Sequence, residues 1–387
     1  MWKHIASNFL TLFIVALVAL GGFLAWAQGQ YRTEGPLETA ICVQVASGAT
    51  MRRVSQNLVD QGAITNASIF RVGADYSDKA DDLKAGSFLV PARASMEEIV
   101  DIITRGGAST CGTEVVFRVG VNGQRIEVRE LDPETNRFVV REEFDPVEEP
   151  IGAFYQEVRE EADTRYRVAL AEGVTSWQVV EALKTADFLE GSVEDIPVEG
   201  SLAPDSYEIR AGESKAELLA EMAEKQELRL AEAWANRVDG LPLASPEEAL
   251  ILASIVEKET GVAEERRTVA SVFVNRLNRG MRLQTDPTVI YGVTEGRGVL
   301  GRGIRQSELR AATPWNTYVI EGLPPTPIAN PGLASIEAAL NPEETNLLFF
   351  VADGTGGHLF AETLAEHNAN VAKWREIERE RQQQSDN

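Results

Sequence analysis

Two glutamates near the end of one predicted helix are the residues best suited to acid-base chemistry. The segment SPEEALILASIVEKETG, residues 245–261, has a serine N-cap, a proline at the first helical position and Glu248 at the third. This spacing predicts a helix that begins with a capping box. Gly261 is expected to close the helix as its left-handed residue, so Glu257 and Glu259 lie in the last turn.

The two carboxylates point to nearly opposite sides of this helix, because each residue turns it by about 100°. Glu259 shares its side with Leu252, Ile255 and Val256, whereas Glu257 lies on a less apolar stripe. A carboxylic acid that is partly desolvated at the negative end of a helix keeps its proton to higher pH, as a general acid must. The alternative is that both glutamates are solvated at a frayed helix end.

The composition limits the classes of function. The chain has 387 residues, which suggests about two or three domains, and a formal net charge of -23. Such acidity argues against nonspecific binding of nucleic acid or of anionic lipid. Three histidines and two cysteines are too few and too scattered to predict a zinc site, so we expect no metal ion and no cofactor.

An uncharged apolar run at residues 9–27, FLTLFIVALVALGGFLAWA, is close to the length that crosses a bilayer. It predicts a single-pass transmembrane anchor, although Ala25 and Ala27, on either side of Trp26, also resemble the small-x-small cleavage site of a signal peptide. Lys3 favours a cytoplasmic N-terminus at residues 1–8, with the body in the periplasm outside the inner membrane. Arg32 on the far side weakens that inference.

The rest of the chain predicts an α+β protein in several parts. After a linker at 28–40, a small α+β module at 41–112 contains Cys42 and Cys111, which either form a disulfide in an oxidising compartment or remain separate buried thiols. The expected elements of the module are strands at 41–45 and 86–91 and helices that begin after Thr50 and Ser95.

Residues 113–165 alternate apolar and polar side chains between turn signals, which predicts hairpins in a β-rich linker or insertion. A larger mixed α+β domain follows at 166–375, and a polar tail at 376–387 ends the chain. The larger domain should contain the helix of Glu259, a second helix after Gly261, and a strand at 347–351.

Hydrogen-bonding side chains gather after residue 281 among glycines and prolines rather than on periodic elements. They are Gln284, Thr285, Asp286, Thr288, Tyr291, Asn316, Thr317 and Tyr318. Polar groups on rigid turns, beside aromatic rings that can stack on sugars, suit a carbohydrate-binding cleft. An ordinary surface rich in turns would have the same composition.

Several segments resemble the YceG-like (MltG) family of endolytic murein transglycosylases. They are ASIVEKET at 253–260, ASVFVNRL at 270–277, MRLQTDPTVIYG at 281–292, NTYVIEGLPPTPIANPG at 316–332 and FFVADGTGGHLFAETLAEHN at 349–368. The similarity is nearly continuous from about residue 245 to 370, and extends more weakly to the anchor and to a LysM-like module at 41–112. Trp315 and Ser206 depart from the family pattern, and residues 114–160 have no counterpart in it.

The resemblance implies a lytic transglycosylase, a carbon-oxygen lyase without cofactor. Such an enzyme cleaves the bond between N-acetylmuramic acid and N-acetylglucosamine within nascent peptidoglycan strands and leaves 1,6-anhydro ends. The catalytic glutamate of the family, the second in the EKET motif, corresponds to Glu259, which would act as general acid and then as base. Peptidoglycan synthases of the elongation or division machinery are the partners that the resemblance suggests.

The resemblance also implies residues that bind the glycan or orient Glu259, each of which could instead hold a turn. They are Gln284, Asp286, Thr288, Tyr291, Asn316, Tyr318, Asn330, His358 and Glu257. Two other functions remain open from the sequence. One is a hydrolytic muramidase that uses water, and the other is a noncatalytic scaffold that binds glycan.

Overall fold

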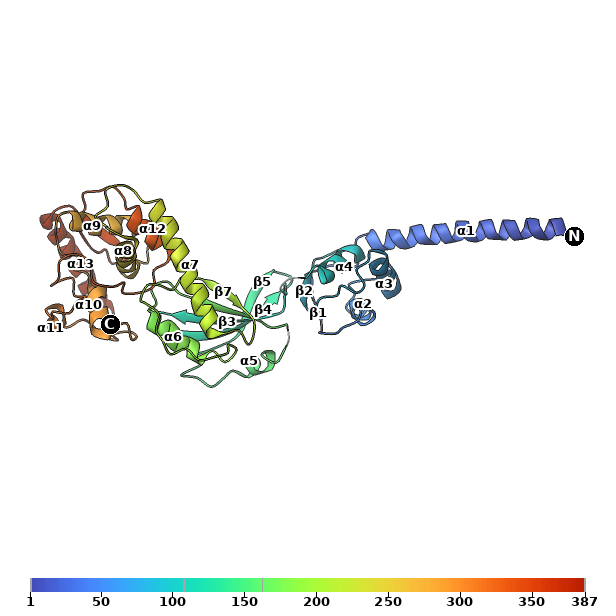
Figure 1. The fold of residues 1–387 in the computed structure, drawn as a ribbon, viewed down its shortest axis with the longest axis horizontal. Coiled ribbons are helices and arrows are strands. Elements are labelled where there is room, and N and C mark those ends of the chain that lie inside the picture. Colours follow the sequence, from blue (N-terminus) through green and yellow to red (C-terminus); the bar gives the residue numbers. More distant parts are fainter. Residues whose placement is uncertain (1, 107–108, 162, 386–387) are drawn as a thin grey trace. The chain divides into compact units, whose positions relative to one another are not determined.

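The computed structural model describes residues 2–106, 109–161 and 163–385, and it is a mixed α+β chain (Figure 1). Contacts divide the chain into two compact units. The first unit comprises the chain up to Val115 together with Glu127–Glu143 and Ile151–Arg165. The second comprises Val116–Ile126, Phe144–Pro150 and the chain from Tyr166 onward.

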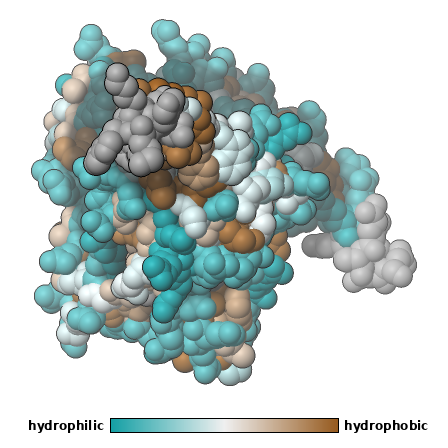
Figure 2. Space-filling model, turned by 90° about the vertical axis from the view of Figure 1, so that its right-hand side faces the viewer, coloured by the Kyte–Doolittle hydropathy of each residue, from teal (hydrophilic) through white to brown (hydrophobic). Residues whose placement is uncertain are grey.

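The first unit begins with helix α1, Trp2–Arg32, of which Leu10–Arg32 is long and apolar enough to cross a membrane. The side chains of residues 10–26 are exposed, and their hydrophobic groups form a brown cluster at the upper left of Figure 2. The helix continues into the predicted linker at 28–40, which was expected to be irregular. The reason is tertiary, because the buried ring of Tyr31 packs against Gly73, where a Cβ atom would overlap it.

The module behind α1 is a two-stranded antiparallel sheet covered by helices. Its elements are β1, Ile41–Val45; α2, Met51–Asp60; α3, Ala67–Tyr76; β2, Gly86–Val90; and α4, Met96–Thr104. The predicted N-caps Thr50 and Ser95 are present, and Ser95 forms the predicted capping box with Glu98. Helix α3, capped by Asn66, was not predicted. Leu58, Phe70, Ile99 and Ile103 are fully buried in the module's apolar core.

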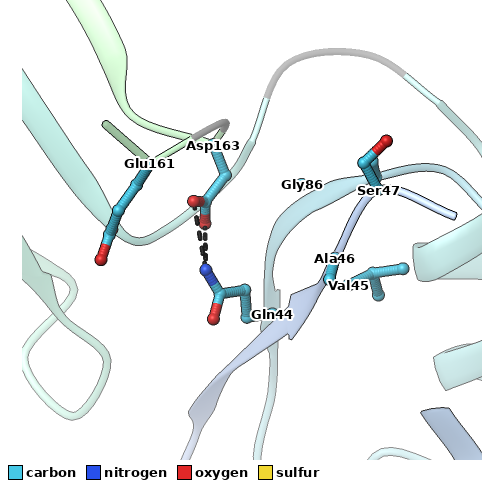
Figure 3. A pocket seen from close by; sticks show the side chains of 8 residues that line it. Gln44, Val45, Ala46, Ser47, Gly86, Glu161 and Asp163 are labelled. Carbon is cyan, nitrogen blue, oxygen red and sulfur yellow. Dashed lines mark hydrogen bonds between the residues drawn. The ribbon is translucent and has the colours of Figure 1, made fainter. Parts of the chain in front are cut away.

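Two further links close the module. A disulfide joins Cys42 to Cys111, with 5.9 Å between the Cα atoms, so the open question about the cysteines is answered in favour of a bridge. Asp163 accepts hydrogen bonds from Gln44 Nε2 at 3.1 and 3.2 Å, as Figure 3 shows, and from the Ser87 hydroxyl. The carboxylate of Asp163 therefore binds side chains from both β1 and β2.

The predicted hairpins are confirmed in a five-stranded sheet of order β5-β4-β3-β6-β7. The strands are β3, Thr113–Gly120; β4, Gly123–Asp132; β5, Arg137–Phe144; β6, Arg165–Leu170; and β7, Ser206–Ile209. Helix α5, Ala153–Val158, follows β5, and helix α6, Ser176–Thr185, follows β6. Thr175 caps α6 as Thr50 caps α2.

Helices dominate the remainder of the second unit. They are α7, Lys215–Ala235; α8, Pro246–Glu259; α9, Arg266–Asn278; α10, Asp286–Thr294; α11, Gln306–Leu309; α12, Leu333–Leu340; and α13, Leu364–Ser385, with a short 3-10 helix η1 at Ala263–Glu265. Strands β8, Phe349–Ala352, and β9, His358–Ala361, form an antiparallel hairpin. Helix α8 packs on α12 and α9, so that Leu252, Ile255 and Phe273 are buried in one core.

The two ends of α8 differ from the prediction. Ser245 accepts the amide hydrogen of Glu248 as expected, but the Glu248 carboxylate accepts from Ala244 rather than from Ser245, so the capping box is incomplete. Gly261 is not in the left-handed region. The helix ends instead because Thr260 is extended at φ -135° and its hydroxyl accepts the amide hydrogen of Val262.

The polar segment after residue 281 is also more regular than expected. Asp286, Thr288 and Tyr291 lie on helix α10 rather than on an irregular turn. Pro287 is compatible with this helix because the first turn needs no amide hydrogen from it.

Candidate functional site

Glu259 is the last residue of α8 and is half-buried. The apolar residues on its side of the helix, Leu252, Ile255 and Val256, are fully buried, and the residues on the side of Glu257, among them Ala253, are buried as well. One carboxylate oxygen of Glu259 accepts a hydrogen bond from the Thr285 hydroxyl. Helix packing and the hydrogen bond from Thr285 therefore hold the carboxyl group of Glu259.

Burial raises the pKa of the Glu259 carboxyl above its ordinary range. The hydrogen bond from Thr285 opposes this rise, and so do the positive charge of Arg276 and that of His358 when its ring is protonated, whereas the negative charge of Asp286 adds to it. A carboxyl group with a raised pKa keeps its proton nearer to neutral pH, as a general acid requires. The group favoured by the helix geometry thus has the electrostatic character expected of an acid.

Thr285, whose hydroxyl group contacts Glu259, is held by hydrogen bonds to two other buried threonines. The amide of Thr285 donates to Thr317 Oγ1 at 3.0 Å, and the Thr288 hydroxyl donates to the Thr285 carbonyl oxygen at 2.7 Å. The hydroxyl oxygens of Thr288 and Thr317 are 2.8 Å apart. Because all three side chains are almost completely buried, this network sets the position of the Thr285 hydroxyl.

Arg276 is a buried cation that connects helix α9 to two other segments of the chain near Glu259. Its Nε donates to the carbonyl oxygen of Leu348 and its Nη1 to that of Leu283, both at 2.6 Å. Burial lowers the pKa of the Arg276 guanidinium, while the charges of Tyr318 and Glu259 oppose that change. The guanidinium also lies 5.4 Å from the centre of the Phe349 ring.

Asp286 and Tyr318 form a more exposed pair beside the same carboxylate. The Tyr318 hydroxyl donates to Asp286 Oδ1 at 2.7 Å. The pKa of Tyr318 is raised by burial, and the negative charges of Asp286 and Glu259 add to that rise. Gln284, in the left-handed region at φ 50°, donates its amide hydrogen to the Thr317 carbonyl oxygen at 3.2 Å and exposes its side chain.

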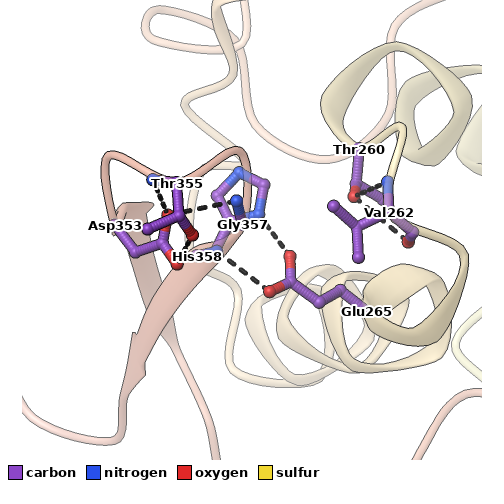
Figure 4. Close-up of polar contacts among 7 residues, drawn as sticks. All are labelled: Thr260, Val262, Glu265, Asp353, Thr355, Gly357 and His358. Atoms are coloured by element: carbon purple, nitrogen blue, oxygen red, sulfur yellow. Dashed lines mark hydrogen bonds and ion pairs between the residues drawn. The ribbon is translucent and has the colours of Figure 1, made fainter.

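His358, the first residue of β9, is held by Glu265 of η1. Glu265 accepts hydrogen bonds from the amide of His358 at 3.0 Å and from its Nδ1 at 2.7 Å (Figure 4). The imidazole also contacts Phe350 edge-on, with 5.1 Å between ring centres. The ring is near enough to the Glu259 carboxyl to favour the carboxylate when the ring is protonated.

The opposite side of the end of α8 contacts other loops. Glu257 Oε2 accepts the amide hydrogen of Gly332 at 2.9 Å, and Lys258 Nζ donates to the Gly173 carbonyl oxygen at 3.1 Å. Burial lowers the pKa of the Lys258 ammonium. Glu257 and Lys258 therefore connect α8 to the segments that follow β6 and precede α12.

The remaining predicted site residues lie in structural contacts. Asn330 is fully buried, accepts the amide hydrogen of Leu202 and donates to the Val174 carbonyl oxygen. Asn316 is fully buried and donates to three carbonyl oxygens in the segment 308–311. The Tyr291 hydroxyl donates to Glu199 at 3.1 Å, and its ring packs on Trp315.

The structure therefore gathers one part of the predicted set around Glu259. The residues of this group are Gln284, Asp286, Thr288, Tyr318 and His358. Sequence reasoning missed Arg276 and Glu265, and it gave Thr285 no role beyond the polar segment. A signal existed for Arg276, because it follows Val269, Val272 and Phe273 at spacings of seven, four and three and so lies on the apolar face of its helix.

Fold and site together define a class of protein: a mixed α+β chain with an apolar N-terminal helix and one half-buried glutamate of raised pKa at the end of a core helix. In the described part of the chain, no group of three or more histidine, cysteine, aspartate or glutamate side chains could hold a metal ion. The chain belongs to the YceG-like family, whose model matches residues 43–136 and 147–373. The match includes 114–136 and 147–160, so the prediction that residues 114–160 have no counterpart in the family was wrong.

The chain is also similar to two proteins named endolytic murein transglycosylase and to one solved structure. An endolytic murein transglycosylase of Bacillus subtilis (strain 168) is 36% identical over 178 residues, which are 46% of this chain and 48% of that protein. One of Streptococcus pneumoniae serotype 2 is 28% identical over 381 residues, covering 94% of this chain and 64% of that protein. A crystal structure of a yceG-like protein from Listeria monocytogenes has a TM-score of 0.46 at 25% identity, over 86% of this chain and 99% of that one. The chain thus spans about half to two thirds of the length of these two transglycosylases.

Proposed function

We propose that this chain is a membrane-anchored endolytic lytic transglycosylase of peptidoglycan. It would cleave the bond between N-acetylmuramic acid and N-acetylglucosamine within a glycan strand and leave a 1,6-anhydro end. The observation that carries the proposal is the raised pKa of the half-buried Glu259, held by the Thr285 hydroxyl. Membership of the YceG-like family and the names of the two similar transglycosylases support it.

In the proposed reaction Glu259 acts twice. As a protonated acid it gives its proton to the glycosidic oxygen while the bond from that oxygen to C1 of the muramyl sugar breaks through an oxocarbenium-like state. The resulting carboxylate then takes the proton of the C6 hydroxyl as O6 forms a bond to C1. Because the sugar supplies its own nucleophile, the reaction consumes no water, and Glu259 ends in the protonated state in which it began.

The surroundings of Glu259 suit both halves of this cycle. Burial favours the protonated acid that begins the reaction, whereas Thr285 and Arg276 favour the carboxylate that forms during it. Gln284, Asp286 and Tyr318 are proposed to bind the glycan beside Glu259, because they lie in the same group of residues and are not completely buried. Glu257, Tyr291, Asn316 and Asn330 are proposed to act by holding the loops of the site.

The N-terminal part supports a location at the membrane. We propose that α1 is a retained single-pass anchor with a cytoplasmic N-terminus, which leaves the module at 41–112 and the catalytic domain at 166–375 in the periplasm. The disulfide between Cys42 and Cys111 fits that oxidising compartment. The module would bind glycan as a LysM-like domain. The anchor would present nascent strands to Glu259, beside the peptidoglycan synthases that make them.

Product analysis tests the proposed reaction. Purified full-length protein is incubated with peptidoglycan, and the glycan ends are identified by mass spectrometry. The expected products carry 1,6-anhydro ends inside former strands. Reducing ends would instead indicate a hydrolytic muramidase, and intact strands that nevertheless bind the protein would indicate a noncatalytic scaffold.

A second experiment tests the role of the anchor. Peptidoglycan is pulse-labelled in cells that carry either the full chain or a form released from α1. The full chain should cut newly made strands preferentially, and the released form should shift cleavage toward older strands. Equal cleavage of new and old strands by the two forms would remove the proposed role of the anchor.

A further inference from the structure

The hydrogen bonds of Glu265 determine which nitrogen of His358 carries a proton. The Glu265 carboxylate accepts from the backbone amide of His358 through Oε1 and contacts Nδ1 through Oε2 at 2.7 Å. A carboxylate that accepts hydrogen bonds needs a proton on Nδ1. The neutral ring then carries no proton on Nε2, so Nε2 becomes a hydrogen-bond acceptor.

The pair sits beside the chain segment that leaves the proposed acid. Glu265 follows Glu259 by six residues, through the turn made by Thr260 and Val262, and Figure 4 shows this turn across from His358. The His358 ring lies within electrostatic range of the Glu259 carboxyl, since a protonated ring would favour the carboxylate. In the described residues, no hydrogen bond is made to His358 Nε2, and this nitrogen points away from Glu265 (Figure 4).

The strand turn before His358 is built to receive the Glu265 carboxylate. Asp353 accepts hydrogen bonds from the amides of Thr355 and Gly357, at 2.6 and 3.1 Å, which closes the turn between β8 and β9. A Cβ atom at Gly357 would lie 2.7 Å from Glu265 Oε1. A larger residue at position 357 would displace the Glu265 carboxylate. The contact between Glu265 and His358 therefore depends on the glycine in this turn.

We propose that Glu265 is a positioning residue that keeps His358 in the Nδ1-protonated form, so that Nε2 accepts a hydrogen bond from a hydroxyl group of the bound glycan beside Glu259. The inference rests on the proposed function for its ligand. It adds a second acceptor to the site, and it gives Glu265 a part in the reaction although that residue does not touch the sugar. A carboxylate that fixes the tautomer of a histidine in this way is a recurrent device of enzyme sites.

Two variants separate this role from simple support of the fold. His358→Asn keeps a donor near the position of Nδ1 for Glu265 but removes the acceptor at Nε2. Glu265→Gln offers one oxygen to two donors, so its amide group should turn toward Nδ1 and force the proton onto Nε2. His367→Asn is the matched control, because it removes the other histidine of the C-terminal segment and its Nδ1 has no hydrogen-bond partner.

The readouts are kinetics and the state of the imidazole in the full chain. We expect kcat/KM for anhydro ends to fall about tenfold in His358→Asn, the scale of one lost hydrogen bond. Glu265→Gln should fall similarly, His367→Asn should match the wild type, and Tm should be unchanged in His358→Asn. The chain has three histidines, so selective nitrogen-15 labelling can follow His358 directly. Its spectrum should show the proton on Nδ1 in the wild type and on Nε2 in Glu265→Gln.

The outcomes that would overturn the inference are distinct from those that would overturn the proposed function. Wild-type kcat/KM in His358→Asn would remove the role of Nε2, and wild-type kcat/KM in a folded Glu265→Gln would remove the positioning role. A wild-type ring protonated on Nε2 would contradict the inference even without kinetics. Absence of anhydro ends from the wild-type protein would instead contradict the proposed function, and the nitrogen spectrum would still report the tautomer.

Discussion

The module behind α1 and the Glu259 site are held together by different chemistry. The module has an apolar core that includes Leu58, Phe70 and Ile99, and a disulfide closes it. The Glu259 site also lies next to an apolar core. Its polar side chains, however, are held by buried hydrogen bonds, among them those of Thr285 and Arg276. A polar network specifies direction as well as proximity, because each hydrogen bond has a preferred geometry. The difference suggests that the module requires stability, whereas the site requires atoms in defined positions.

Removal of the disulfide should have the largest effect, and this effect should be confined to the module and leave the Glu259 site unchanged. Cys42→Ser with Cys111→Ser should lower the free energy of unfolding of the first unit by about 4 kcal/mol, because a link between residues 69 apart restricts the unfolded chain. The Glu259 site should keep its chemistry, since neither cysteine belongs to it. Calorimetry with and without reductant, beside the product assay, measures both effects. Loss of activity without a change in unfolding would contradict the comparison.

A smaller effect is expected when a hydroxyl group is removed from the site. Thr285→Val keeps the shape of the side chain but loses the donor to Glu259, so the rate of anhydro product formation should fall about tenfold. Without this donor the carboxylate is less stable and the pKa of Glu259 rises further. The limb of the pH-rate profile in which activity falls as Glu259 loses its proton should therefore move to higher pH. Thr285→Ser retains the hydroxyl and is the control, and a pH profile that is identical in Thr285→Val would contradict the role of this contact.

The smallest expected effect is on stability. The substitution that removes the acid, Glu259→Gln, should make the folded protein more stable although it lowers the activity. Because burial raises the pKa of Glu259 in the folded protein, the folded state binds a proton more tightly than the unfolded chain. The stability that this contributes is present below the pKa of the unfolded carboxyl and is lost as pH rises through the raised value. Glu259→Gln cannot ionise, so it should be more stable than the wild type at neutral pH, and this difference should shrink in acid, where the wild-type carboxyl is also neutral. Thermal melts across pH test this, and a Tm difference that does not vary with pH would count against a buried, titrating carboxyl.

The same difference between the regions explains how much could be predicted from the sequence. Helices with apolar periodicity and caps, such as those that begin after Ser95 and Ser245, were predicted within a few residues because local chemistry determines them. The Cys42 to Cys111 pairing was left open, since sequence carries no distance. The extension of α1 to Arg32 was missed because it depends on Tyr31 packing against Gly73.

At the site, helix geometry already preferred Glu259 over Glu257, because the residues on its side of α8 are the more apolar ones, although the structure buries both sides of the helix up to Val256. The partners Arg276, Thr285 and Glu265 were harder to find, since they come from separate segments that only the fold brings together. Glu265 lies in an exposed-looking acidic stretch, and nothing in its neighbours along the chain indicates that it reaches His358. Contacts between distant segments are the part of a site that a single sequence does not contain.

The assignment of the acid to Glu259 rather than to Glu257 is the central claim, and one paired measurement tests it most directly. Wild type, Glu259→Gln and Glu257→Gln are compared for the rate of 1,6-anhydro end formation on the same peptidoglycan, with Tm measured for each. We predict that Glu259→Gln loses about 10²- to 10⁴-fold in rate while remaining folded, as expected for loss of a general acid. Glu257→Gln should stay active, because a glutamine oxygen can still accept the amide hydrogen of Gly332. Retained activity in Glu259→Gln, or an equal loss in a folded Glu257→Gln, would contradict the account.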